Sequence, residues 1–194
     1  MSAVISDQTY SPEAYLALER AAAFKSEFHD GHIYAMTGAS REHNLVSVNI
    51  CREMSLRLKD RPREVYINDM RVRAAESRDY FYPDVVLVCD QPEFEDEKLD
   101  TLLNPSLLIE VLSPSTEAYD RGGKFARYRK IPSVREYLLV SQDQARIERY
   151  VRQGDHWLMT EAVGLEASMV LETVECTLAL REVYDKVLAG AQAE

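Results

Sequence analysis

The chain has 194 residues, within the usual size of one folded domain, and 46% of them are hydrophobic, which is enough for a sizeable core. Its formal net charge of −10 weighs against a protein that coats nucleic acid, because Lys and Arg side chains supply most non-specific affinity for phosphate. The charge weighs less against a metal-dependent enzyme, because a bound cation reverses the local field of the carboxylates that hold it. We expect a single domain over residues 1–194.

The cysteines and the apolar runs indicate the compartment. Cys51, Cys89 and Cys176 are few and widely spaced, which fits neither a disulfide framework nor the ligand spacing of a zinc site. The chain starts without the basic and apolar segments of a signal peptide, and no apolar run approaches the roughly 20 residues that span a bilayer. We therefore expect a soluble, cytoplasmic protein that does not enter a membrane.

The first third of the chain predicts two helices separated by a hairpin. Ser11-Pro12 is typical of a helix start, and Asp30-Gly31 readily takes the positive φ angles of a two-residue hairpin turn. Apolar side chains that recur every four positions, up to a break at Pro62, predict the second helix. In chain order these elements cover Ala14–Ala23, Ser26–His29, His32–Met36 and Ser40–Lys59.

The middle of the chain predicts buried strands. Nearly continuous apolar runs bounded by Pro, Asp or Ser are typical of central strands, whereas alternation of apolar and charged residues indicates a half-buried one. An acidic loop and a helix that ends near Pro132 lie between them. The expected strands are Met70–Ala74, Val85–Val88, Leu107–Leu112 and Tyr137–Val140, with the loop at Asp90–Asp100 and the helix at Asp120–Lys130.

The last quarter predicts a second hairpin, a strand and a closing helix. Gly154 lies at the centre of the expected turn between two strand-like segments. The expected elements are Arg146–Arg152, His156–Thr160, Thr173–Leu180 and Arg181–Leu188. This mixture of strands and helices predicts a mixed α/β (α+β) fold.

Two of the predicted central strands each contain one carboxylate. Because side chains alternate along a strand, Asp84 shares a face with Val86, and Glu110 shares a face with Leu108. A charge in such a run is costly to bury unless it is paired, hydrogen-bonded or bound to a cation, so each acid alone also fits a strand end paired with Arg or Lys. Together with Glu27 on the first hairpin, they predict an oxygen-ligand site for Mg²⁺ or Mn²⁺.

Basic residues follow this candidate site. They would suit phosphate contacts, although charge on a helix is commonly only a solvated face. His43, near the start of the second helix, is a candidate contact to a phosphate or a metal-bound water, although a lone histidine is more often structural. The basic residues of this stretch are Arg121, Lys124, Arg127, Arg129, Lys130 and Arg135.

A set of short motifs between about Tyr10 and Val140 resembles a known family. The motifs are Glu27 with Asp30-Gly31, His43, Tyr82-Pro83-Asp84, Ile109–Thr116, Asp120, Lys124, Tyr128 and Arg135-Glu136-Tyr137. The set is similar to the Uma-type restriction endonucleases, which belong to the PD-(D/E)xK nuclease superfamily. The resemblance implies a restriction-endonuclease-like central mixed sheet flanked by helices, Mg²⁺-dependent cleavage of DNA phosphodiester bonds, and metal-ligand roles for Glu27, Asp84 and Glu110.

One position departs from the superfamily motif. A lysine usually lies two residues after the second acid, about 6.6 Å along the same strand face, but Leu112 occupies that place here. Lys124 is the best replacement, since a helix that begins near Asp120 can return its ammonium group to the carboxylates. The other interpretation is an exposed i,i+4 pair of Asp120 and Lys124, worth only about 0.3 to 0.5 kcal/mol.

The predicted function is that of a metal-dependent endonuclease. Asp84 and Glu110 would hold the metal, Glu27 and the backbone carbonyl of Val111 would help to orient it, and Lys124 would support the nucleophile or the charge that develops on phosphate. The residues expected to contact DNA are His43, Arg121, Arg127 and Lys130.

Two other functional interpretations stay open. A non-catalytic scaffold or nucleic-acid-binding protein on the same fold is suggested by Leu112, which replaces the usual lysine. A small-molecule phosphoesterase is favoured by the sequence pI of about 5.0. Cutting both strands of DNA needs two active sites, so a homodimer is a further expectation.

Overall fold

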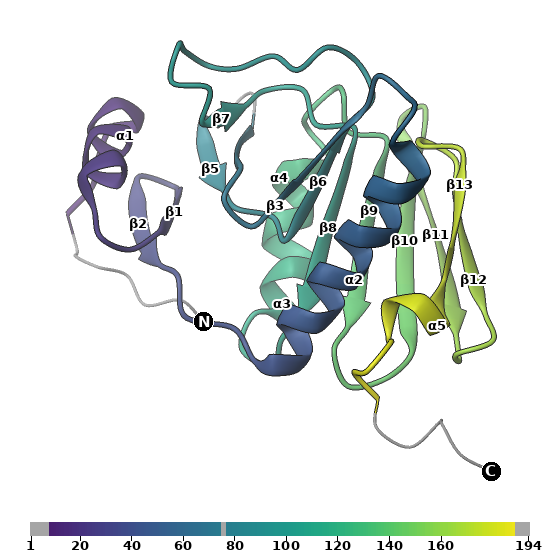
Figure 1. The fold of residues 1–194 in the computed structure, drawn as a ribbon. Helices are drawn as coiled ribbons and strands as arrows, with labels where there is room; N and C mark the ends of the chain where they lie inside the picture. The colour runs from purple at the N-terminus through teal and green to yellow at the C-terminus, as the bar shows by residue number, and fades with distance from the viewer. Residues whose placement is uncertain (1–7, 75–76, 189–194) are drawn as a thin grey trace.

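The computed structural model of the chain describes residues 8–74 and 77–188, so the ends of the predicted 1–194 domain lie outside the described residues. Its centre is a six-stranded mixed sheet, flanked by helices as predicted (Figure 1). In the order of their hydrogen-bonded neighbours, the strands are β11 (His156–Val163), β10 (Arg146–Gln153), β9 (Glu136–Ser141), β8 (Leu107–Leu112), β6 (Val85–Val88) and β3 (Glu64–Ile67). β8 and β9 run parallel, and the other neighbours run antiparallel.

A smaller sheet stands beside the central one, with the first helix, α1 (Pro12–Ala21), next to it (Figure 1). Its strands, in sheet order, are β2 (His32–Ala35), β1 (Ser26–His29), β5 (Asp79–Phe81), β4 (Arg71–Ala74) and β7 (Thr101–Leu102). Ser11 caps α1 by accepting a hydrogen bond from the Ala14 amide at 3.2 Å, as its sequence position predicts. The Asp30-Gly31 turn joins β1 to β2 with positive φ at both residues.

The two faces of the central sheet pack against different helices (Figure 1). The four-residue spacing predicted for the second helix places Val46, Ile50, Met54 and Leu58 of α2 (Arg41–Leu58) against one face. Leu107, Ile109 and Val111 of β8 point toward that same core, which also includes the hairpin of β12 (Ser168–Leu171) and β13 (Cys176–Ala179) and the last helix, α5 (Leu180–Val183). Leu108 and Leu112 point to the opposite face, so the predicted alternation along β8 is confirmed.

The opposite face is covered by a helical segment that changes its winding. It consists of α3 (Glu117–Tyr119), a π-helical turn η1 (Asp120–Lys124) and α4 (Phe125–Tyr128). Tyr128 packs in the second core with Leu108 and Leu112. The sequence predicted one helix over Asp120–Lys130, so the segment was located correctly, but its start and its π-helical turn were not.

Four short strands were absent from the predicted elements: β3, β5, β7 and β12. The closing helix was predicted over Arg181–Leu188 but covers only Leu180–Val183. Within the described ranges, no helix has both the length and the apolar character needed to cross a bilayer. All three cysteines are free thiols.

Candidate functional site

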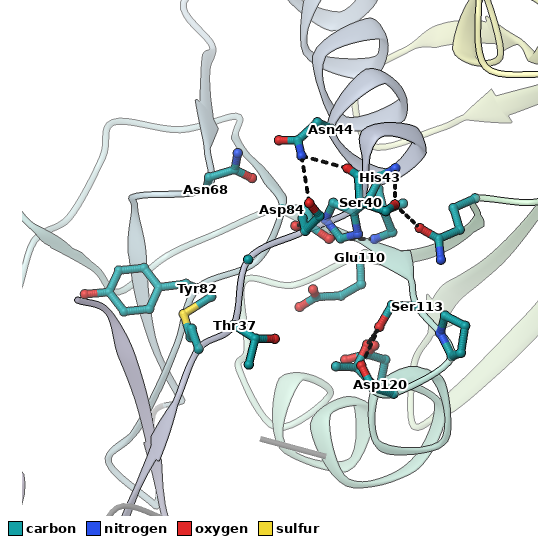
Figure 2. A pocket seen from close by; sticks show the side chains of 18 of the residues that line it. Thr37, Ser40, His43, Asn44, Asn68, Tyr82, Asp84, Glu110, Ser113 and Asp120 are labelled. Carbon is teal, nitrogen blue, oxygen red and sulfur yellow. Dashed lines mark hydrogen bonds and ion pairs between the residues drawn. The ribbon is translucent and has the colours of Figure 1, made fainter. Parts of the chain in front are cut away.

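Asp84 directly precedes β6, Glu110 lies within the neighbouring strand β8, and the two residues come together at one place in the sheet. Val85 pairs with Ile109 in the antiparallel register of β6 and β8, so one step further along this register places Asp84 beside Glu110. Figure 2 shows both side chains at one pocket, with Asp120 on the other side of Glu110. The pair that the alternation pattern singled out therefore lies at a single site.

The Asp84 carboxylate is held in place on both of its oxygens. Oδ2 accepts a hydrogen bond from the Val111 amide at 2.7 Å, and Oδ1 lies 2.8 Å from Nε2 of His43. His43 is in the first turn of α2, where its own amide donates to the Ser40 side chain. The predicted phosphate contact of His43 stays a prediction, and in this structure the imidazole orients Asp84.

Lys124 is buried among carboxylates. Its Nζ lies 2.9 Å from Glu110 Oε1, 3.0 Å from Glu27 Oε1 and 3.8 Å from Asp120 Oδ1, and only 7% of its side chain is exposed. Glu27 also accepts a hydrogen bond from the Tyr82 amide at 3.2 Å, which fixes the hairpin arm against the site. The ammonium group thus reaches the predicted acids, and the exposed i,i+4 pair considered as the alternative is wrong.

Burial dominates the protonation of this cluster. It raises the pKa of Glu110 well above its usual value, against the lowering effect of Lys124 and with the neighbouring acids adding to the rise. Burial also raises the pKa of Asp120. Burial alone would lower the pKa of Lys124, but Glu110, Glu27 and Asp120 together raise it well above its usual value. These directions favour a charged Lys124 ammonium group, and they make Glu110 and Asp120 bind protons more readily than exposed carboxyl groups do.

Two residues of the site were given no role by the sequence reasoning. Asp120 is 3% exposed and faces the pocket, and the Tyr128 hydroxyl donates a hydrogen bond to Glu110 Oε1 at 2.9 Å. Asp120, Lys124 and Tyr128 are spaced four apart, so they share one face of the helical segment. This four-residue spacing could have predicted, from the sequence alone, that all three side chains point into the site from one face of the helical segment.

The π-helical turn brings Asp120 and Lys124 to the pocket, and a glycine allows its packing. A Cβ added to Gly123 would lie 2.6 Å from the Tyr119 ring, whereas one added to Gly122 would have no neighbour within 4 Å. The Tyr119 ring is itself stacked on His29, with centroids 5.3 Å apart. Only a residue without a side chain fits at position 123 while this stack is kept.

Gly123→Ala should lower the free energy of unfolding by about 1–3 kcal/mol, because the Tyr119 ring must leave its stack on His29. Gly122→Ala is the matched control in the same turn, and there alanine should be neutral or slightly stabilising. Urea unfolding of both variants measures the difference. Equal stability of the two would show that the close approach does not constrain the turn.

Leu112 explains why the usual lysine position is not used. Its side chain is 4% exposed and packs in the core that contains Tyr128 and Tyr137. A lysine there would place its charge among aromatic and aliphatic side chains, which is costly without a partner. In this chain the ammonium group instead enters the site from the helical segment.

Two of the predicted DNA contacts, Arg121 and Arg127, pair with carboxylates of this protein. Arg121 pairs with Glu117 at 2.8 Å and with Glu148 of β10 at 3.0 Å. Arg127 pairs with Asp79 at 2.9 Å and with Asp30. Lys130 does not line the pocket. The segment after it is tied to the residues that precede β8 by a hydrogen bond from Ser133 Oγ to the Pro105 carbonyl at 2.7 Å. Of this stretch only Lys124 lines the pocket, and the phosphate contacts expected of Arg121, Arg127 and Lys130 stay a prediction.

The donor set of the pocket suits a hard divalent cation. Asp84, Glu110, Glu27 and Asp120 offer only carboxylate oxygens, and one ammonium group leaves negative charge uncompensated. In the described part of the chain, no three His, Cys, Asp or Glu side chains are yet arranged to hold one ion. Lys124 lies between Glu27 and Glu110, so the predicted convergence of three acids on one point is not present in this arrangement.

The fold of this chain is shared with a protein of known structure. A solved structure, described as a putative nuclease belonging to DUF820 from Anabaena variabilis, matches with a TM-score of 0.76 over 92% of this chain and 99% of that one. At 15% sequence identity, this likeness shows the fold alone.

The chain belongs to the Uma2 family, whose model is described as "Putative restriction endonuclease" and matches residues 12–181. Two relatives come from Synechocystis sp. The uncharacterized protein sll1609 is 41% identical over 170 residues, covering 87% of this chain and 96% of the relative. The uncharacterized protein slr1290 is 36% identical over 177 residues, covering 90% of each. The predicted family is thereby confirmed.

Proposed function

We propose that the protein is a divalent-metal-dependent endonuclease that hydrolyses DNA phosphodiester bonds. The observation that supports this most strongly is the contact of Lys124 with Glu110 at 2.9 Å, in the same pocket as Asp84. Two acids from adjacent strands and one ammonium group are the side chains that phosphodiester hydrolysis needs, and here they come from three separate elements of the chain.

Asp84 and Glu110 would hold Mg²⁺ or Mn²⁺, with Glu27 and the Val111 carbonyl as the further predicted ligands. When bound, the cation would activate water and stabilise negative charge on the phosphate. His43 and the Val111 amide fix the Asp84 carboxylate, so its orientation is set before substrate arrives. Tyr128 does the same for Glu110 by donating to Oε1.

Lys124 would contact the attacking water or a phosphate oxygen. Its ammonium group is a charged donor in a site from which bulk water is largely excluded, and such a donor stabilises charge that develops during the reaction more strongly than it does in open solvent. The cluster also fixes its position, because carboxylates surround Nζ within 4 Å.

A cleavage assay tests this proposal. Wild-type protein with Mn²⁺ should nick or cut supercoiled plasmid or single-stranded circular DNA, and chelation of the metal should stop the reaction. Asp84→Asn keeps the size of the side chain and should lose at least a factor of 100 in rate, as expected for the loss of an electrostatic contact to the reacting groups. No cleavage of either DNA form with Mg²⁺ or Mn²⁺ would favour the non-catalytic interpretation.

A further inference from the structure

Most of the positive charge of this protein is already neutralised by its own carboxylates. All Lys and Arg residues lie in the described ranges, and most of them have a carboxylate oxygen within 4 Å. Those that form no ion pair with a described residue are Lys59, Lys98, Arg129, Lys130, Arg152 and Lys186. None of these six lines the pocket.

The pocket itself therefore offers no free cation among the described residues. Its basic lining residues are Lys25 and Lys124. Lys25 pairs with Asp69 at 2.7 Å and donates to the Asn68 carbonyl at 3.1 Å, and Lys124 is buried among acids. A duplex is held largely through many phosphate contacts to Lys and Arg, and the lining of this pocket does not provide them.

Neutral hydrogen-bonding groups line the pocket instead. They include Thr37, Asn68, Ser113 and Gln142, around a cavity of about 550 Å³. Figure 2 shows Thr37, Asn68 and Ser113 around the space that Glu110 faces. A cavity of this size holds a compact group, and neutral donors and acceptors match the edge of an unpaired base better than a row of phosphates.

Asn68 is prepared for such a contact. The backbone N–H of Asn68 donates to the Asp84 backbone carbonyl at 3.0 Å, and the backbone carbonyl of Asn68 accepts from Lys25 Nζ. The φ angle of Asn68, 49°, is in the left-handed region. The backbone is thus fixed next to Asp84, whereas the side-chain amide makes no hydrogen bond to any described residue. An amide both donates and accepts, as the edge of a base requires.

We propose that the substrate of this site is single-stranded DNA, with one unpaired base held in the pocket and Asn68 as a base-contacting residue. This inference rests on the proposed nuclease function. A single strand brings fewer phosphates to an acidic protein, and its bases need no unstacking from a duplex. One active site is sufficient to cut it, so the homodimer expected for double-strand cutting is not required.

Binding and cleavage of the same DNA test the inference separately. A labelled 20-nucleotide single strand and its duplex are titrated with wild-type protein by fluorescence anisotropy in Ca²⁺, with gels to verify that the DNA is intact. The single strand should bind at least ten times more tightly, and with Mn²⁺ it should be cut at least ten times faster. Equal or tighter binding of the duplex, or no binding of either, would overturn the inference. Preferred binding of the single strand without any cleavage would support it and contradict the nuclease function.

A variant pair tests the role of Asn68. Asn68→Gly removes the amide while keeping a residue that tolerates positive φ, so it should weaken single-strand binding about three- to tenfold with little change in melting temperature. Leu99→Gly is the matched control, because Leu99 has a φ of 55°, is 58% exposed and does not line the pocket. Equal affinity of Asn68→Gly and wild type would remove Asn68 from the binding site.

Discussion

Lys124→Met should reduce single-turnover DNA cleavage by a factor of about 10² to 10³, as expected when one charged donor to the reacting groups is lost. It should also destabilise the protein by on the order of 3 kcal/mol without metal, because Glu27 and Glu110 are then buried without their cation. Single-turnover kinetics and thermal unfolding measure the two effects independently.

Lys130→Met is the control for this variant. Lys130 is exposed, forms no ion pair with a described residue and does not line the pocket, so its stability should change by no more than about 0.5 kcal/mol. Full cleavage by Lys124→Met would contradict the role of this lysine. Equal loss of activity in both variants would instead indicate general attraction of phosphate.

A divalent cation should compensate for the missing ammonium group. Lys124→Met leaves the acids of the cluster with more uncompensated negative charge, so Mn²⁺ should raise its melting temperature by more than it raises that of wild type. A larger increase in Lys124→Met than in wild type would show that the variant is folded and that its acids bind the cation, so its lower stability comes from the lost ammonium charge and not from misfolding. A smaller increase in the variant than in wild type would mean that the cation does not bind at the cluster.

Mn²⁺ at about 100 times its dissociation constant should stabilise wild type by about 2.7 kcal/mol if it binds only the native state. For a chain of this size, that corresponds to a rise in melting temperature of about 5–11 °C. Asp84→Ala combined with Glu110→Ala should abolish the rise, because these two acids are the proposed ligands. Calorimetry with and without Mn²⁺ gives the shift directly.

Exposed acids provide the matched control for the metal shift. Asp90 and Glu166 have side chains that are 78% and 85% exposed, and neither lines the pocket. Asp90→Ala combined with Glu166→Ala should keep the full shift. An equal shift in both double variants would assign the stabilisation to non-specific binding of Mn²⁺.

The positions of the two strand acids could be predicted because they depend on local pattern. Alternation placed Glu110 on the face of β8 that carries Leu108, and the antiparallel neighbour β6 brought Asp84 next to it. Both strands are apolar runs, in which an isolated carboxylate stands out. The hairpin arm with Glu27 could be predicted for a similar reason, since Asp30-Gly31 marks its turn.

The ion pairs of Arg121 and Arg127, on the helical segment α3–η1–α4, could not be predicted because their partners are distant in the sequence. Arg121 finds Glu148 on β10, and Arg127 finds Asp79 on β5. β5 has three residues and β7 has two, too few for an apolar period to appear. A sequence pattern indicates which residues are charged, but only the tertiary fold decides which charges remain free for a substrate.

The π-helical turn was also beyond the sequence pattern. Gly122-Gly123 disfavours a regular helix, but the glycines alone do not indicate that the turn widens to bring Asp120 and Lys124 to one pocket. The family resemblance identified both residues as part of a motif. Their burial against Glu110 and Tyr128 is what gives that motif a physical role.

Anomalous diffraction from crystals soaked in Mn²⁺ locates the cation without relying on activity, so it shows whether Asp84 and Glu110 hold a metal. We expect one strong peak in the pocket, contacted by the carboxylates of both Asp84 and Glu110. No peak there at saturating Mn²⁺, with Lys124 still placed between Glu27 and Glu110, would contradict the proposed metal site.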